Sequence, residues 1–96
     1  MYDTIEIEKK LKDLKPTLTA KFFVKKIGYF GSFADNEQNE DSDLDILVEF
    51  SKPIGWEFFS LEKFLEEALE LKVDLVRKNA IKKHLKRKIL DQVVFV

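Results

Sequence analysis

GSFADNEQNEDSDLDILVEF, which spans residues 31–50, contains the strongest structural signal in this chain. Its last eight residues, 43–50, alternate between two sets of side chains. One set is Leu44, Ile46, Val48 and Phe50, and the other is Asp43, Asp45, Leu47 and Glu49. Because successive side chains of a strand point to opposite faces, this alternation predicts a strand with one buried face. The polar and acidic residues 35–42 before it predict a loop.

Two carboxylates of the predicted strand, Asp43 and Asp45, are two residues apart and therefore project from the same face. At a rise of about 3.3 Å per residue, their Cβ atoms lie roughly 6–7 Å apart. Carboxylates at that separation can reach one hard cation or two adjacent ones. Mg²⁺ takes one or two carboxylates and fills its remaining positions with water and phosphate oxygens. The pair therefore predicts a divalent-metal site.

A third carboxylate, Asp74, lies in the apolar run Val73-Asp74-Leu75-Val76, within a predicted strand over residues 72–76. An Asp in the middle of a buried strand is costly unless it is paired or metal-bound. If this strand neighbours residues 43–50, Asp74 joins the first two carboxylates. Three carboxylates held together repel one another, so the arrangement implies a cation.

The pair Gly31-Ser32 follows a predicted strand over residues 22–30 and begins a predicted helical turn. Gly lets a ligand approach the backbone closely, and the free N–H groups at a helix start can bind phosphate together with the Ser32 hydroxyl. Ser32 can also be interpreted as a helix cap, a role that is compatible with phosphate binding.

The remaining elements are predicted from hydrophobic periodicity and chain-breaking residues. A first helix covers residues 4–14 and is ended by Pro16, because proline disrupts a helix interior. An amphipathic helix covers residues 56–71, a basic helix covers 80–91, and the ending VVFV forms a last strand or a packed tail. This order predicts an α/β or α+β fold in which a mixed sheet packs against helices.

Length and composition limit the class of protein. We expect residues 1–96 to form a single domain, since the chain has room for one. There is no Cys, which excludes a disulfide scaffold and thiolate metal sites and is compatible with a cytoplasmic location. The charged N-terminus does not read as a signal peptide, and no apolar run approaches the roughly 20 residues of a membrane helix, so we expect no membrane contact.

Charge is segregated along the chain. Residues 35–45 hold six acidic side chains and no basic one, whereas residues 77–88 hold seven basic side chains and no acidic one. The acidic segment is either a solvated loop or part of a metal site, and the basic segment is either a solvated face or a contact for phosphate, RNA or an acidic partner. Without interleaved aromatic residues, direct nucleic-acid binding is not favoured. Trp56 is either a core-edge residue, which we prefer, or an exposed anchor for a partner.

The spacing Gly-Ser-x10-Asp-x-Asp from Gly31 to Asp45 resembles the signature of the DNA polymerase β-like nucleotidyltransferase superfamily. Asp74 stands where that family places its third carboxylate. The resemblance covers roughly residues 25–96 and is strongest to the minimal nucleotidyltransferase (MNT) branch. It implies the nucleotidyltransferase (polymerase β-like) fold.

The resemblance also implies a chemistry. ATP would bind with two Mg²⁺ ions held by Asp43, Asp45 and Asp74, and Gly31 and Ser32 would hold the β- and γ-phosphates. Attack at the α-phosphorus would transfer AMP to a hydroxyl acceptor and release pyrophosphate. Asp74 would help to hold the metal nearest the attacking hydroxyl.

The sequence departs from the family pattern at three positions near the Gly-Ser turn. Asn36 replaces a common Gly, and Asn is the next best residue for a left-handed conformation. Phe33 and Asp35 stand where many minimal members carry Arg. The basic segment from Arg77 onward is a candidate to compensate for the lost cations.

Short MNT proteins resemble antitoxins of type VII toxin–antitoxin pairs, whose partner is a HEPN-family ribonuclease toxin. The resemblance therefore implies AMP transfer to a Tyr of such a toxin, within a homo- or hetero-oligomer. Two alternatives remain open. One is a non-catalytic antitoxin that neutralises its partner by complex formation, which the missing arginines favour. The other is a small-molecule nucleotidyltransferase, which would need an acceptor pocket in a short chain.

Overall fold

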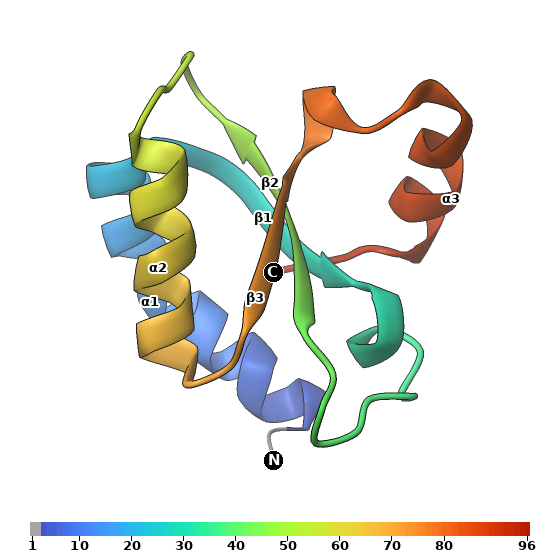
Figure 1. Cartoon of the computed structure of the whole chain (residues 1–96). Helices are drawn as coiled ribbons and strands as arrows, with labels where there is room; N and C mark the ends of the chain where they lie inside the picture. Colours follow the sequence, from blue (N-terminus) through green and yellow to red (C-terminus); the bar gives the residue numbers. More distant parts are fainter. Residues whose placement is uncertain (1–2) are drawn as a thin grey trace.

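The computed structural model describes residues 3–96, and four strands form its centre. The elements in order are α1 (Thr4–Phe22), β1 (Val24–Phe30), the 3₁₀ turn η1 (Gly31–Phe33), β2 (Leu44–Phe50), α2 (Glu57–Leu69), β3 (Val73–Arg77), the 3₁₀ turn η2 (Lys78–Ala80), α3 (Lys83–Gln92) and β4 (Val94–Phe95). The strand order is β3-β2-β1-β4; β2 and β3 are parallel, and the other pairs are antiparallel. Helices α1 and α2 lie on one side of the sheet and α3 on the other (Figure 1). The predicted mixed sheet packed against helices is therefore confirmed.

The hydrophobic core lies between the sheet and the helix pair α1 and α2. Its fully buried members from these helices and from β2 are Ile7, Leu11, Leu18, Leu44, Ile46, Val48, Leu61, Leu65 and Leu69. The predicted alternation of residues 43–50 is confirmed, because Leu44, Ile46 and Val48 all belong to this cluster. Leu47 is also buried but lies outside the cluster, as expected for a residue on the opposite face of β2.

The first helix is longer than predicted, because α1 passes through Pro16 and ends at Phe22. The prediction that Pro16 ends the helix was therefore wrong. A proline within a helix costs about 3 kcal/mol, partly through a lost backbone hydrogen bond. Leu18 beyond it is fully buried and Phe22 is partly buried, and burying such a side chain contributes about 1.5–3 kcal/mol. Tertiary packing thus outweighs the local penalty.

The C-terminal third of the chain differs from the predictions in detail. Residues 78–80 form η2, and α3 begins at Lys83 instead of residue 80; its Leu85 is 41% exposed. The predicted last strand is confirmed as β4, in which Val94 pairs with Tyr29 of β1. Within residues 3–96, no helix combines the length and apolar character needed to cross a membrane.

The outer edge of β3 is covered by side chains of α2. The Glu66 carboxylate accepts a hydrogen bond from the Val73 N–H at 3.0 Å, and the Glu62 carboxylate accepts one from the Leu75 N–H at 3.3 Å. Unpaired N–H groups of an edge strand are a template for pairing with another chain. The two glutamates occupy these donors within the molecule.

Candidate active site

The three predicted carboxylates come from the beginnings of two neighbouring strands. In the parallel register of β2 and β3, Asp45 is paired with Asp74, and Asp43 immediately precedes β2. The expectation that Asp74 joins the pair is therefore confirmed at the level of strand register. Asp45 is half-buried, whereas Asp43 and Asp74 are exposed. The antiparallel pairing of Phe30 with Asp45 brings the end of β1 to the same place.

The local environment disfavours ionisation of Asp45. Burial raises the pKa of this carboxyl to about 6, and the negative charges of Asp74 and Asp43 and a hydrogen bond with Asp74 add to the effect. Within residues 3–96, burial and neighbouring carboxylates dominate this shift, so ionisation of Asp45 calls for a compensating positive charge. A bound cation would supply that charge.

Gly31 brings the turn after β1 directly against Asp45. Its φ of +73° lies in the left-handed region, and a Cβ built on it would overlap Oδ2 of Asp45. Only a glycine therefore satisfies both the backbone conformation and the close approach. Ser32 follows inside η1, whose N-cap residue is Phe30 and lacks a side-chain cap. The interpretation of Ser32 as the helix cap was wrong, and its hydroxyl is not committed to that role.

The loop after the turn adopts the conformation expected from its sequence. Asn36 has a φ of 57°, so the prediction that Asn replaces Gly in a left-handed position is confirmed. Within the loop the Asn39 N–H donates to the Ser42 hydroxyl at 2.9 Å. Phe33 is buried in the core, so its side chain does not take the place of an arginine at the site.

Gln92, at the end of α3, is a site residue that sequence reasoning missed. Its Oε1 accepts a hydrogen bond from the Gly31 N–H at 3.3 Å, and its Nε2 donates to Oδ2 of Asp35 at 2.6 Å. The side chain thus connects the Gly31 turn and the loop to the C-terminal helix. A glutamine at a helix end has no distinctive spacing, so the sequence carried no signal for this contact.

The carboxylates of this site fit a metal ion whose remaining ligands come from water and the substrate. Across residues 3–96, no three Asp, Glu, Cys or His side chains converge closely enough to form a complete metal site. Asp45 and Asp74 nevertheless lie side by side, with Asp43 close enough to affect the pKa of Asp45. Mg²⁺ in phosphate-transfer sites characteristically uses one or two carboxylates, and the remaining ligands are water and substrate phosphates.

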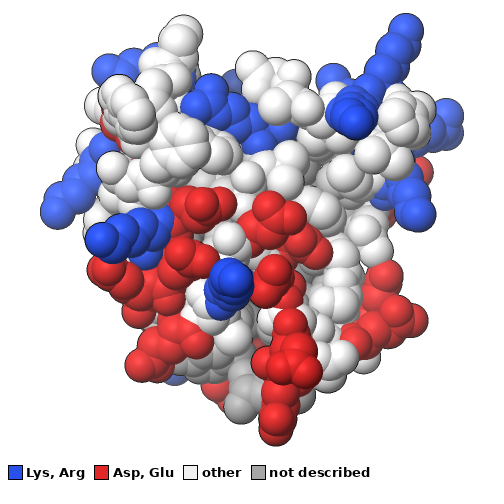
Figure 2. All heavy atoms as spheres, viewed as in Figure 1, with Lys and Arg blue, Asp and Glu red and all other residues white. Residues whose placement is uncertain are grey.

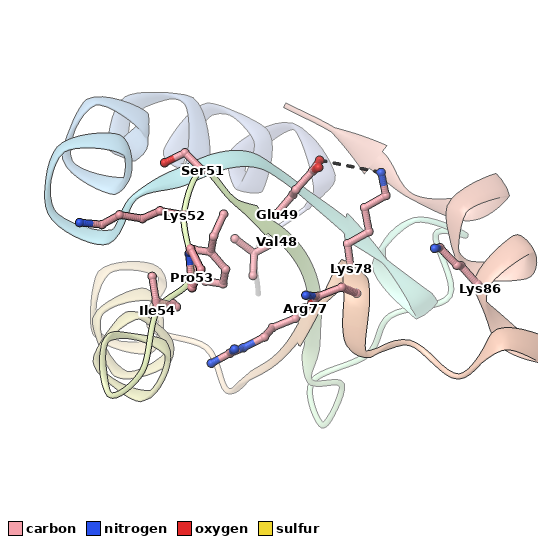
Figure 3. A pocket seen from close by; sticks show the side chains of 11 residues that line it. Val48, Glu49, Ser51, Lys52, Pro53, Ile54, Arg77, Lys78 and Lys86 are labelled. Atoms are coloured by element: carbon pink, nitrogen blue, oxygen red, sulfur yellow. Dashed lines mark ion pairs between the residues drawn. The ribbon is translucent and has the colours of Figure 1, made fainter.

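A pocket of about 570 Å³ lies at the opposite end of β2 (Figure 3). Its lining includes Glu49 of β2 and the basic residues Arg77, Lys78 and Lys86. Four residues of strand separate Asp45 from Glu49, which corresponds to roughly 13 Å. Arg77, Lys78 and Lys86 thus line a pocket towards the other end of β2, and compensation for the missing arginines by the basic segment stays a prediction.

Sequence comparison gives a consistent set of relatives. The family model of the nucleotidyltransferase domain matches residues 4–96. The chain is 45% identical over 92 residues to the protein adenylyltransferase MntA of Thermococcus cleftensis, an alignment that covers 95% of this chain and 93% of MntA. It is 47% identical over 93 residues to a Methanocaldococcus jannaschii protein provisionally named a protein adenylyltransferase, with 95% of each chain covered.

Solved structures agree with the sequence relatives. A provisionally assigned minimal nucleotidyltransferase superposes with a TM-score of 0.83 at 28% identity, covering 97% of this chain and 95% of the other. A toxin–antitoxin structure with AMP-PNP gives a TM-score of 0.70 at 26% identity and covers 98% and 72% of the two chains. A complex of a tri-AMPylated Shewanella oneidensis HEPN toxin with its MNT antitoxin gives 0.60 at 25% identity, covering 96% and 66%.

Proposed function

Because this chain belongs to the nucleotidyltransferase domain family, we propose that it transfers AMP from ATP to a hydroxyl group of a protein acceptor, with Mg²⁺ as cofactor. The observation that carries the proposal is the meeting of Asp45, Asp74 and Gly31 at one end of the sheet. A phosphate-binding turn and a carboxylate pair in contact are the two parts that phosphoryl chemistry with a metal needs.

Each site residue has a distinct role in this proposal. Asp43, Asp45 and Asp74 would hold the Mg²⁺ ions, and Gly31 and Ser32 would hold the β- and γ-phosphates. The acceptor hydroxyl loses its proton to solvent and its oxygen bonds to the α-phosphorus, while the bond from that phosphorus to the oxygen bridging the α- and β-phosphates breaks and pyrophosphate leaves. When bound, two Mg²⁺ ions would stabilise charge on both the entering and the leaving oxygen. The Asp74 side chain is exposed, so an acceptor can approach it from solvent.

The acceptor in this proposal is a Tyr of a HEPN-type toxin, and the chain acts as the antitoxin in the cytoplasm. Support comes from the 45% identity to MntA, a protein adenylyltransferase, and from the similarity to an MNT antitoxin in complex with an AMPylated HEPN toxin. Such a pair functions as a hetero-oligomer in which the toxin supplies the acceptor side of the reaction.

The direct test is label transfer from α-³²P-ATP in the presence of Mg²⁺ and the protein encoded by the adjacent gene. We expect label on the acceptor with the wild-type protein and none with the Asp43→Ala/Asp45→Ala variant. Analytical gel filtration shows whether the variant still forms the complex. Transfer that persists in the variant, or no transfer from a wild-type complex that forms normally, would contradict the proposal.

A second candidate function is neutralisation of the toxin by binding alone. The observation that favours it is the absence of Arg at positions 33 and 35, where Phe33 is buried and Asp35 is tied to Gln92. The two functions differ in one measurement, the growth of cells that produce the toxin. Rescue by the Asp43→Ala/Asp45→Ala variant would support neutralisation by binding, and loss of rescue with complex formation intact would support AMP transfer. A small-molecule nucleotidyltransferase would instead modify a low-molecular-weight acceptor without the partner.

A further inference from the structure

The pocket at the far end of β2 is strongly basic. Four cationic side chains line it, namely Lys52, Arg77, Lys78 and Lys86, and Glu49 is the one acidic lining residue in the described chain. Four positive charges and one negative charge leave an excess of three. Glu49 pairs with Lys78 at 3.9 Å, which is the long limit of an ion pair. Figure 3 shows Arg77, Lys78 and Lys86 around the space between the loop after β2 and the end of β3, whereas the Lys52 side chain points away from it, with its Nζ 3.7 Å from the centre of the Phe23 ring.

A chain of ring contacts connects this pocket with an exposed aromatic surface. The Arg77 guanidinium lies 4.5 Å from the centre of the Phe58 ring, and Phe58 contacts Phe59 with ring centres 5.5 Å apart. Phe59 in turn contacts Trp56 at 5.9 Å. Trp56 is 83% exposed and Phe59 is 60% exposed, so the preferred assignment of Trp56 to the core edge was wrong. Exposed Trp and Phe residues beside Arg are typical of the residues that anchor protein–protein interfaces.

The charge distribution over the same face favours a short acidic peptide segment over a nucleic acid, whose negative charge continues along its whole backbone. Figure 2 shows basic side chains along the top of the molecule and acidic side chains over its middle and lower part, across α2 and β3. A nucleic-acid backbone that left the pocket along this face would meet those carboxylates. A short acidic peptide segment can place its carboxylates in the pocket while its apolar side chains contact Trp56 and Phe59.

The pocket is separate from the carboxylates but close enough for a molecule bound there to reach them. It lies about four residues of strand, or roughly 13 Å, from Asp45. An extended acceptor segment of about four residues would span this distance from the pocket to the carboxylates.

We propose that this basic pocket, together with the exposed Trp56 and Phe59 that are linked to it through Phe58, is the docking site for an acidic segment of the protein acceptor. The identity of that acceptor rests on the proposed function, whereas the binding of an acidic polypeptide does not. Docking away from the carboxylates would hold the acceptor in place while its hydroxyl group reaches the nucleotide.

Two double variants separate the pocket from the general charge of the chain. Lys52→Glu/Lys86→Glu reverses two exposed cations that line the pocket. Lys83→Glu/Lys88→Glu reverses two exposed cations of α3 that do not line it, with the same change in net charge. Circular dichroism at matched concentration verifies that both variants retain the fold.

The first measurement is binding in the absence of nucleotide and metal, so that its result does not depend on catalysis. A hexaglutamate peptide is titrated into the ¹⁵N-labelled protein, and two-dimensional NMR spectra locate the shifted amides. We expect shifts concentrated at residues 49–54 and 77–79 and at Lys86, at least a tenfold loss of affinity in Lys52→Glu/Lys86→Glu, and a change below twofold in Lys83→Glu/Lys88→Glu. Equal losses in both variants, or shifts spread evenly along α3, would overturn the proposal.

A 12-nucleotide RNA of mixed sequence is titrated in the same way as the alternative probe. Binding of this RNA at the pocket tenfold tighter than the peptide would assign the site to nucleic acid and overturn the proposal. The second measurement is label transfer to the protein acceptor. We expect Lys52→Glu/Lys86→Glu to raise the KM for the acceptor at least tenfold with the KM for ATP unchanged within twofold. An unchanged acceptor KM would overturn the proposal while leaving the transferase function intact.

Discussion

Asp45 carries a charge in a position that the folded protein itself does not stabilise. The carboxyl is half-buried, lies beside Asp74 and contacts the backbone of Gly31. Its pKa of about 6 is above the ordinary value of 3.8, so the folded state binds this proton more tightly than the unfolded state does. The metal-free protein therefore loses stability as the pH rises from about 4 to about 6.

Asp45→Asn should raise the free energy of unfolding of the metal-free protein at pH 7.5 while abolishing nucleotidyl transfer. Asn removes the uncompensated charge, and we expect a gain of about 1 kcal/mol once solvent screening of this half-exposed group is considered. The gain should shrink towards pH 4.5, where the wild-type carboxyl is protonated in the folded state. Urea unfolding at the two pH values measures the difference, and Asp41→Asn in the exposed loop controls for net charge. An equal gain at both pH values would contradict this account.

Gly31→Ala should damage both the fold and the reaction. The φ of +73° is strained for any residue with a Cβ by about 1–2 kcal/mol, and the new methyl group would overlap the Asp45 carboxylate. We expect transfer to fall about a hundredfold or more, because the turn and the carboxylate can no longer keep their contact. Gly55→Ala is the matched control, since a Cβ there meets no atom within 4 Å. Wild-type transfer by Gly31→Ala would show that the close approach is not needed.

The individual site residues differ in how far the sequence reveals them. Asp43, Asp45 and Gly31 lie within one stretch, and their chemistry follows from local spacing and strand alternation. Asp74 could be predicted only on the condition that its strand is a neighbour of β2, which is a tertiary fact. Gln92 lies 61 residues from its hydrogen-bond partner Gly31, and no local pattern connects the two.

At the scale of elements, hydrogen bonds of Gln92 connect the end of α3 to the Gly31 turn and to Asp35. The contact with Asp35 can be tested by exchanging which of the two side chains carries the amide and which the carboxylate. Gln92→Glu keeps an acceptor for the Gly31 N–H but places a second carboxylate against Asp35, where the present contact is 2.6 Å. We expect the KM for ATP to rise about three- to tenfold with a smaller change in kcat, because the neutral amide that donates to Asp35 has become a carboxylate that repels it.

The compensating variant is Asp35→Asn/Gln92→Glu, in which the Asn amide donates to the new carboxylate. We expect the KM for ATP to return to within twofold of the wild-type value in the label-transfer assay. A double variant no better than Gln92→Glu alone would show that Gln92 acts only through overall stability.

The edge of β3 gives a second prediction about elements. Glu62→Ala/Glu66→Ala removes the acceptors of the Val73 and Leu75 N–H groups. We expect a loss of about 1–3 kcal/mol in the free energy of unfolding, together with association at high concentration as the edge becomes free to pair. Urea unfolding and sedimentation velocity measure the two effects. Glu67→Ala, an exposed residue of the same helix, should change neither, and a monomeric, equally stable double variant would contradict the capping role.

Element boundaries were the least predictable part of the fold, and α1 shows why. Pro16 was expected to end the helix because proline disrupts a helix interior. The helix nevertheless continues to Phe22, because burial of Leu18 in the core stabilises the turns beyond Pro16. The same reason explains Trp56, whose position follows from which face α2 turns to the core rather than from its own hydrophobicity. The β2 strand was predictable because Leu44, Ile46 and Val48 recur with a period of two on the face that packs against the core.

The whole molecule places opposite charges at opposite ends of the same two strands. The carboxylates gather where β2 and β3 begin, and the basic pocket lies where they end. The net charge of -1 hides this separation, because the two regions nearly cancel. The core lies on the side of α1 and α2, and α3 lies on the other side of the sheet, so the two ends of β2 and β3 are left for ligands.

The exposure of Trp56 also means that intrinsic tryptophan fluorescence can report partner binding. It is the single tryptophan, and at 83% exposure its indole is surrounded mostly by water in the folded state. Its emission should therefore lie near that of free tryptophan and change little when the protein unfolds. A partner that covers this side chain would transfer the indole to a less polar environment, so we expect a blue shift of about 5–10 nm on acceptor binding. The same titration with Lys52→Glu/Lys86→Glu should need a much higher acceptor concentration, and an emission maximum that never moves in a formed complex would place the partner elsewhere.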